Sequence, residues 1–446
     1  MLKIFETNEE YNNYIQSEPL LISGVLYYIK EDNSAHFSTN NIDGEYKIYD
    51  LGGCLSTYII GAAIYAKYNI TKDYGWDPHI CYAQVTNSIN CVFVDGKYYS
   101  GEEIAAVSGQ LPLELGEHEA VFILNTNEIP TYFFANTDCA EMLVEVIVSD
   151  YYTAVGDNFI YYDSPQLKKI TFGNRIETIG QQILNSNNNG VTEINIPQNI
   201  ETIGSFAFSG SGIKKAIFPN TITSIGANAF LRCLKLEEVY ISDSDNTITI
   251  GGSAFSHCES LKKLYLGKGV TLSSSSVFDN CYIEEVTLNT NVGYNYTGDK
   301  SNSLKKLVIE KDVTDDIVGY QNCKALESVI IKANSIKIGN YGLNTNPNLK
   351  EVIINEGCTR LGQECLRDNP KLTELELPST VTYVGKWCFN GSPITSLTVH
   401  ATTPPATGGY LGMPNNCKIY VPAASVSAYK AATNWTTYAD NIEAIP

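Results

Sequence analysis

The sequence predicts a mainly β protein with short helices, in which a curved solenoid of repeated coils follows a separate β-rich (α+β) N-terminal domain. Three observations support this fold class. One motif recurs every 21–25 residues from Leu167 to about Thr398. Each copy holds a short stretch with the alternating pattern of a strand. Residues 1–142 lack the motif and carry a different charge balance.

The clearest copy of the motif lies between residues 236 and 261. It reads Leu236-Glu-Glu-Val-Tyr-Ile, then Ile250-Gly-Gly-Ser-Ala-Phe, then Cys258, before a new copy begins. A short strand in each copy of this length is typical of a leucine-rich repeat solenoid. The copies start at Leu167, Val191, Ile213, Leu236, Leu261, Ile283, Leu304, Leu326, Leu349, Leu372 and Ile394, which gives about ten coils over residues 167–398.

The apolar residues of one copy suggest how the coils hold together. Because side chains alternate along a strand, Val239 and Ile241 should point inward and Tyr240 outward. One coil has too little apolar surface to fold alone, so each coil buries that surface against its neighbours. The phenylalanines of the motif should therefore form a buried column: Phe208, Phe230, Phe255, Phe278 and Phe389.

Two further columns are expected at the turns. One position is glycine in most coils, which indicates either a positive φ or a lack of room for Cβ: Gly180, Gly204, Gly226, Gly251, Gly339, Gly362 and Gly385. Seven residues later stand small polar or thiol side chains that suit capping of backbone groups in turns: Ser211, Cys233, Cys258, Asn346, Asn369 and Ser392.

The recurring I-G-x-x-A-F-x-x-C-x-x-L resembles the BspA-type leucine-rich repeat family of bacterial and phage-associated proteins. The resemblance covers residues 167–435 and includes an end segment with Lys418-Ile-Tyr-Val-Pro and Trp435. It implies a non-catalytic binding scaffold, often an adhesin. Two copies depart from the pattern. Residues 283–303 lack the I-G-x-x-A-F half, and residues 304–325 keep only Gly319 and Cys323 of it, so we expect a bulge or an inserted loop there.

The charge distribution supports a domain boundary near residue 142. The whole chain has a net charge of −19, of which residues 1–142 carry −14 with 6 basic and 20 acidic residues. These residues also hold 14 of the 30 tyrosines. Exposed tyrosines favour contact with other proteins, whereas buried ones simply suit strands. We interpret residues 1–142 as an acidic domain for docking or assembly, through which the chain contacts further copies or virion neighbours.

The two ends of the repeat array should be closed by atypical segments, because a solenoid must cover its terminal apolar layers. Residues 143–166 contain Leu143-Val-Glu-Val-Ile-Val, which fits the strand template and suggests a degenerate N-terminal capping coil. Residues 399–446 should form a C-terminal cap. We expect a last strand at Lys418–Val421, a short helix over residues 425–432 with Ser425 as its cap, and Tyr429 and Trp435 packed over the last coil.

Two outward columns can be read along the predicted strands. The first alternates in charge, which stabilises neighbouring strands without any ligand: Lys169, Glu193, Lys215, Glu238, Lys263, Glu285 and Lys306. The second is apolar or aromatic in its middle, as expected for a partner-binding surface, although such residues also suit strands in general. Its central members are the candidate binding residues: Tyr240, Tyr265, Val308, Ile330 and Ile353.

The loops and cysteines offer less chemistry. Residues 293–302, with Tyr294 and Tyr296, should form a projecting loop that contacts a partner. The acidic stretches at residues 242–246 and 312–316 lack the ligand spacing of a calcium loop and suit solvated turns better. No C-x-x-C or histidine pair suggests a metal site. Cys365 and Cys388 share one column in neighbouring coils, where they form a disulfide or pack as reduced thiols.

Composition and motifs exclude several functions. The acidic charge argues against nucleic acid or an anionic membrane as partner, and no apolar run reaches the ~20 residues of a membrane helix. No P-loop, G-x-S-x-G or H-E-x-x-H motif occurs, so we expect neither catalysis nor a cofactor. A catalytic N-terminal domain remains a minor alternative, because paired carboxylates leave little trace in a sequence.

The sequence therefore predicts a non-enzymatic scaffold for recognition or adhesion, with a protein or a cell-surface glycan as its ligand. The main alternative is a structural or attachment component of a bacteriophage virion. The first residues, Met1-Leu-Lys-Ile-Phe-Glu, do not resemble a signal peptide. We expect an extracellular or cell-surface location if a leader is removed from the chain, and a virion or cytoplasmic one otherwise.

Overall fold

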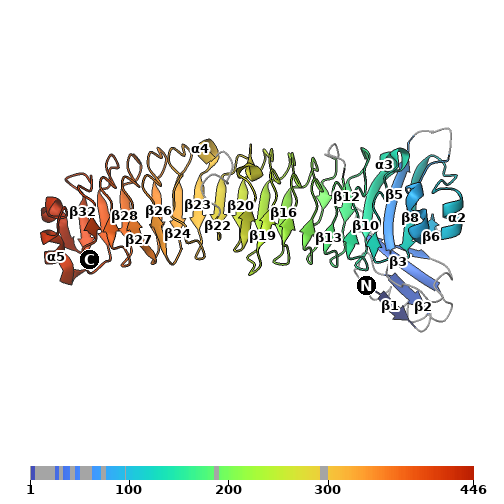
Figure 1. Cartoon of the computed structure of the whole chain (residues 1–446), viewed down its shortest axis with the longest axis horizontal. Helices are drawn as coiled ribbons and strands as arrows, with labels where there is room; N and C mark the ends of the chain where they lie inside the picture. Colours follow the sequence, from blue (N-terminus) through green and yellow to red (C-terminus); the bar gives the residue numbers. More distant parts are fainter. Residues whose placement is uncertain are drawn as a thin grey trace. The chain divides into compact units, whose positions relative to one another are not determined.

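The computed structural model describes residues 2–5, 26–29, 34–40, 46–50, 63–71, 77–95, 97–184, 190–291 and 300–446. The chain forms two compact units, Met1–Lys235 and Leu236–Pro446. Both are built from short strands with few and short helices, as Figure 1 shows. The predicted class, a mainly β leucine-rich repeat solenoid, is confirmed.

The first unit opens with two sheets. The smaller one has the order β1 (Leu2–Phe5), β2 (Leu26–Ile29), β3 (Ser34–Asn40), β4 (Tyr46–Asp50). The larger one has the order β14 (Glu193–Ile194), β12 (Lys169–Thr171), β10 (Leu143–Val148), β5 (Ala63–Ile70), β8 (Gly116–Leu124), β6 (Ile89–Val94), β7 (Lys97–Ser100). The β6–β7 hairpin turns at Asp95, as its Asp-Gly sequence predicts.

Strand β10 joins the coils to the strands that precede them. It pairs parallel with β12 and antiparallel with β5, so one hydrogen-bonded sheet runs across residue 142. The segment after β10 contains β11 (Ala154–Val155), which pairs with β13 (Thr178–Ile179) and with β9 (Glu128–Ile129). The domain boundary at residue 142 therefore stays a prediction from charge and motif.

Each later coil of the first unit contributes a strand to a second row. Strands β13, β15 (Thr202–Ile203) and β17 (Ser224–Ile225) pair in parallel, one coil after another. Strand β16 (Lys215–Phe218) has the alternating burial expected of a strand with one face on the core. Helices are short here: η1 (Ala83–Ser88), α2 (Gly101–Ala106) and α3 (Thr137–Met142). Helix α2 begins with a capping box between Ser100 and Glu103.

The second unit contains two rows of parallel strands (Figure 1). The first row comprises β18 (Glu238–Ile241), β20 (Lys263–Leu266), β22 (Glu285–Leu288), β23 (Lys306–Ile309), β24 (Ser328–Ile331) and β26 (Glu351–Ile354), followed by β28 (Glu374–Leu377), β30 (Ser396–Val399), β32 (Lys418–Val421) and β33 (Ile442–Ala444). The second row comprises β19 (Ile248–Ile250) with β21 (Val270–Leu272), and β25 (Ile336–Ile338), β27 (Cys358–Leu361), β29 (Tyr383–Val384) and β31 (Ala406–Thr407).

Alternation along these strands places the core where the motif predicts it. In β18, Val239 and Ile241 are buried and Tyr240 is exposed. The phenylalanine column is also confirmed. All five of its members are buried, and the rings stack between neighbouring coils, with centroids 5.1 Å apart for Phe208 and Phe230 and 5.4 Å for Phe255 and Phe278.

The glycine column exists because no room is left for a side chain. A Cβ at Gly385 would lie 2.4 Å from backbone atoms of Gly362 and Gln363, closer than real Cβ atoms approach. The same crowding by the backbone of the preceding coil occurs at Gly180, Gly204, Gly226 and Gly362. None of these five has a positive φ. Close stacking of coils therefore selects glycine here, and of the two expected reasons only the steric one applies.

The polar column forms a buried ladder between coils. The side-chain oxygen of Asn346 accepts from the Cys323 N–H at 2.7 Å, and that of Asn369 accepts from the Asn346 N–H at 2.9 Å. The Ser392 hydroxyl accepts from the Asn369 N–H at 2.9 Å. A buried backbone N–H without a hydrogen-bond partner costs about 1–3 kcal/mol. These side chains supply that partner in the buried turns. The predicted capping role is confirmed for Asn346, Asn369 and Ser392.

The chain ends in β32, η3 (Ala423–Ser425), α5 (Val426–Ala431), η4 (Thr436–Asn441) and β33. Tyr429 and Trp435 are fully buried with their rings edge to face. The Tyr429 hydroxyl donates to the Ala401 carbonyl and the Trp435 indole N–H to the Pro405 carbonyl. The expected cap by Ser425 is wrong, because its hydroxyl donates to the Thr402 carbonyl at 2.7 Å rather than accepting from the helix.

The irregular coils lie where the motif fails. Among the described residues, β22 is followed by no strand of the second row before α4 (Lys300–Ser303). After β23 the second row is represented by a single bridge between Ile317 and Ile338. The irregularity predicted for residues 283–325 is thus confirmed.

Candidate functional site

Six strands of the second unit bring the second outward column together. The register pairs Tyr240 with Tyr265, Tyr265 with Thr287, and so on along the row. We call this column the outward stripe: Tyr240, Tyr265, Thr287, Val308, Ile330 and Ile353. Its members are neighbours because adjacent parallel strands lie about 4.8 Å apart.

The aromatic end of the stripe is a stacked pair. The rings of Tyr240 and Tyr265 lie 4.4 Å apart between centroids and 14° from parallel. The Tyr265 hydroxyl donates to Asp243 at 3.0 Å. Burial and this hydrogen bond raise the pKa of Tyr265 above its ordinary value, so the hydroxyl stays protonated. Tyr265 is therefore fixed in orientation, and Tyr240, 37% exposed, offers the accessible ring.

The expectation of a continuously exposed stripe is wrong at Val308. This side chain is only 9% exposed, although its register position is outward. Ile330 is half-buried, and Ile353 is 42% exposed. The stripe thus presents two accessible ends, an aromatic one at Tyr240 and an aliphatic one at Ile353, with a less accessible middle.

Charged side chains border the stripe. The predicted alternating column brings Lys263 within 3.9 Å of Glu285. A second ladder with shorter distances, which sequence reasoning missed, lies one residue earlier in the coils from Lys262 to Lys350. There the Glu284 carboxylate lies 3.2 Å from Lys262 and 2.7 Å from Lys305, and Glu327 lies 2.7 Å from Lys350. The repeated Lys-Lys and Glu-Glu pairs in the strand sequences were the available signal. These charged side chains form a hydrophilic rim around the apolar residues of the stripe.

The two acidic stretches meet at a buried amide below the Tyr265 hydroxyl. The Asn289 side-chain N–H group donates to Asp243 at 2.9 Å and to Asp312 at 3.1 Å. Burial alone would raise the pKa of Asp243, but hydrogen bonds from Asn289, the Lys268 N–H and Tyr265 together lower it. Amide and hydroxyl donors thus satisfy these carboxylates. Among the described residues, no three His, Cys, Asp or Glu side chains converge as metal ligands.

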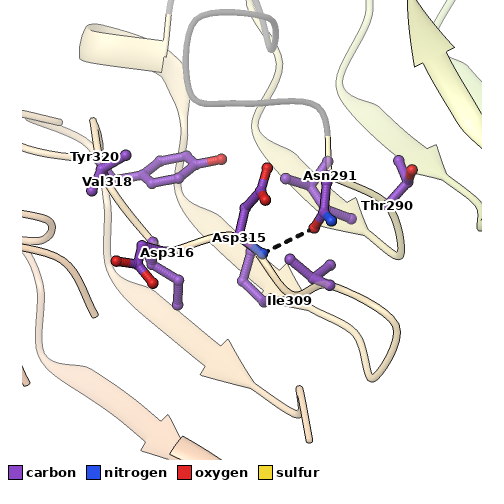
Figure 2. Close-up of a pocket in the computed structure, with 10 residues that line it drawn as sticks. Thr290, Asn291, Ile309, Asp315, Asp316, Val318 and Tyr320 are labelled. Atoms are coloured by element: carbon purple, nitrogen blue, oxygen red, sulfur yellow. Dashed lines mark hydrogen bonds between the residues drawn. The ribbon is translucent and has the colours of Figure 1, made fainter. Parts of the chain in front are cut away.

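A cavity of about 270 Å³ opens in the irregular coils (Figure 2). Its floor is apolar, and its rim carries polar groups from two loops that are joined by a 3.1 Å hydrogen bond from the Asp315 N–H to Asn291. Leu288 and Ile309, inward residues of β22 and β23, are among its apolar lining. It is lined by Leu288, Thr290, Asn291, Ile309, Val313, Asp315, Asp316, Ile317, Val318 and Tyr320.

A second set of exposed aromatics was not foreseen. The residue two positions after the column glycine has a left-handed backbone, with φ of 61° at Tyr341 and 55° at Trp387. Both side chains are exposed, and the Lys386 ammonium lies 4.2 Å from the Trp387 ring centroid. Their fixed distance from the glycine was the signal. A bulky residue in this conformation is uncommon, and it turns the ring away from the core.

Other predicted site residues are placed as follows. Tyr294 and Tyr296 lie outside the described residues. All eleven described cysteines are free thiols and buried. In the described part of the chain, no helix is long and apolar enough to cross a membrane.

Comparisons with known proteins agree with this geometry. A family model described as the BspA type leucine-rich repeat region matches residues 119–237, 186–301 and 294–404, with six copies. No curated protein sequence matches the chain significantly.

Several solved structures also match the chain. A leucine-rich repeat protein from Bacteroides ovatus is 18% identical, with 75% of this chain and 90% of that chain covered and a TM-score of 0.34. The pneumococcal vaccine antigen PcpA is 14% identical, with 95% and 98% covered and a TM-score of 0.26. A leucine-rich cell surface protein from Faecalibacterium prausnitzii is 15% identical, with 73% and 84% covered and a TM-score of 0.25.

Proposed function

This chain belongs to the BspA-type leucine-rich repeat family, and we propose that it is a non-enzymatic scaffold that recognises a protein ligand at a cell surface. The outward stripe is the contact surface, and the coils serve to hold it rigid. None of the described side-chain clusters favours catalysis or a virion role over recognition.

The observation that carries this proposal is the position of the stripe on six hydrogen-bonded strands. Tyr240 and Ile353 are large, accessible and apolar, yet both stand on the side away from the core. Interface centres are typically aromatic or aliphatic with a charged rim. The ladder of Lys262, Glu284 and Lys305 supplies such a rim.

A glycan ligand is the alternative within the same surface. The stacked tyrosine pair leaves the outer face of each ring open and suits either ligand. The aliphatic end at Ile353 supports a protein, because it fits an apolar side chain better than a hydroxyl-rich one.

The test is binding of the fluorescently labelled chain to cultured epithelial and bacterial cells, measured by flow cytometry before and after protease or glycosidase treatment of the cells. Replacing Tyr240 and Ile353 by serine should weaken binding at least about tenfold, since interface anchors of this kind contribute over 1 kcal/mol each. Tyr265 is left intact because its hydroxyl holds Asp243.

The matched control is Tyr282→Ser, which removes a tyrosine of similar exposure, 44%, from outside the stripe. It should bind as the unmodified chain does. Equal binding by the stripe variant and this control would remove the stripe from the proposal, and loss of binding after glycosidase alone would replace the protein ligand by a glycan.

A further inference from the structure

The alanine position of the motif I-G-x-x-A-F is occupied by cysteine near the C-terminal end of the array. In several earlier coils it is a fully buried alanine, as at Ala207, Ala229 and Ala254. In two consecutive coils it is Cys365 and Cys388. A thiol alone packs like a small apolar side chain. Two thiols at the same position in adjacent coils also meet each other.

The geometry of this pair is close to that of a bond. The two sulfur atoms lie 3.4 Å apart with both side chains fully buried. Backbone hydrogen bonds hold the coils in register beside them, from the Leu366 N–H to the Cys388 carbonyl at 3.0 Å and from the Gly385 N–H to the Leu361 carbonyl at 2.8 Å. Adjacent coils about 4.8 Å apart satisfy the Cα separation that disulfides require. Small side-chain rotations can bring the sulfurs to the ~2.0 Å of a disulfide bond.

We propose that Cys365 and Cys388 are a cross-linking site, at which a disulfide staples two consecutive coils once the chain folds in an oxidising compartment. The oxidant is an external small-molecule disulfide. One thiolate attacks it and releases one thiol, and the second cysteine then attacks the mixed disulfide and releases the other. The pair loses two hydrogen atoms and the oxidant is reduced to two thiols.

The disulfide should form while the chain is folding, before the two sulfur atoms become buried. Neither sulfur is accessible after folding, so a mixed disulfide has no room to form. Burial first, and then the neighbouring Cys365 thiol, raise the pKa of Cys388, which suppresses the reactive thiolate. The bond should therefore form quickly during refolding and only slowly in the folded protein.

The disulfide would link two coils near the C-terminal end of the array, where unfolding of a solenoid can begin. Each coil contacts only its neighbours, so unfolding proceeds readily from an end of the array. A cross-link between residues 365 and 388 closes a loop of one coil and removes freedom from the unfolded chain. The last coils and the segment that covers them then stay folded to a higher temperature.

The experiment refolds the full chain in a buffer of oxidised and reduced glutathione and, in parallel, in reductant alone. Peptide mapping by mass spectrometry should find residues 365 and 388 linked, with the mass of two hydrogen atoms lost. The thermal midpoint should rise by about 5 °C over the reduced chain. The double variant Cys365→Ala and Cys388→Ala is the control, because alanine is the normal residue at this position. It should fold, and its midpoint should not respond to the redox buffer.

Three results would overturn the proposal. The first is a pair of unlinked thiols in a chain that refolds fully in the glutathione buffer. The second is a bond from either cysteine to Cys358, the nearby buried thiol of β27. The third is a correct linkage that leaves the midpoint at that of the alanine control, which would show that no stapling results.

Discussion

Two stretches of the second unit, residues 326–399 and residues 283–325, build the same outer face over different interiors. In both, the first-row strands pair in register and carry the outward stripe and its charged rim. In residues 326–399, strands β24, β26 and β28 are each followed by a second-row strand and the column glycine. In residues 283–325 the described part opens into the cavity.

The two halves of the motif therefore have separate structural roles. The half L-x-x-V-x-I builds the face that meets a partner, and the half I-G-x-x-A-F closes the interior behind it. A coil that loses the second half keeps its place in the face, because the hydrogen bonds of parallel strands do not depend on the turn. Recognition and closure can therefore be altered independently.

Crowding the closed interior should reduce the stability of the second unit most. Gly385→Ala should destabilise the second unit by roughly 3 kcal/mol or more, because the new Cβ would lie 2.4 Å from the backbone of the preceding coil. Urea unfolding followed by circular dichroism measures this loss. The control is Gly252→Ala, where the nearest atom is the movable Ser274 hydroxyl at 3.2 Å. A loss equal to that of Gly252→Ala would mean that coils tolerate looser stacking than the structure indicates.

A smaller effect should distinguish the two interiors directly. Val381 and Val313 occupy the same turn position, each with its N–H bonded to the carbonyl three residues earlier. Val381→Phe overpacks a closed coil and should cost about 2–3 kcal/mol. Val313→Phe projects toward the cavity and should cost less than about 1 kcal/mol. Thermal unfolding of the two variants compares them. Equal losses would show that the cavity is not available to a side chain.

The contrast between residues 326–399 and residues 283–325 could be predicted from the sequence, because it depends on local patterns. The strand alternation around Tyr240, the phenylalanine column and the loss of the motif after Ile283 each depend on spacing within one coil. The burial of Val308 could not be foreseen, because its outward register position predicts exposure. The steric reason for glycine at Gly385 also required the neighbouring coil to be in place.

For the candidate site, the sequence predicted which residues are neighbours but not how their side chains interact. The register of the outward stripe follows from the repeat length, so Tyr240 and Tyr265 were correctly placed side by side. Their ring stacking and the hydrogen bond of Tyr265 to Asp243 depend on side-chain rotations that a sequence does not specify. The left-handed backbone at Trp387 was missed because positive φ is normally assigned to glycine.

The smallest change in stability is expected from charges on the outer face, where residues 283–325 and residues 326–399 should behave alike. Hydrogen bonding by Lys305, and then by Lys262, lowers the pKa of Glu284 against the opposing effect of burial, and the Lys350 hydrogen bond lowers that of Glu327 in the regular coils. A carboxyl with a lowered folded pKa stabilises the fold above its unfolded pKa, and that contribution disappears as pH falls through the folded value. For Glu284 the exposed setting limits it to under about 1 kcal/mol.

The measurement is the free energy of unfolding in urea from about pH 6 to about pH 3, a range that spans the titration of a glutamate. Glu284→Gln and Glu327→Gln should each flatten the loss of stability on acidification slightly and by a similar amount. A clearly larger change for Glu284→Gln would mean that the face over the cavity depends on its surface charges, and that the outer strands are not equally well supported in both stretches.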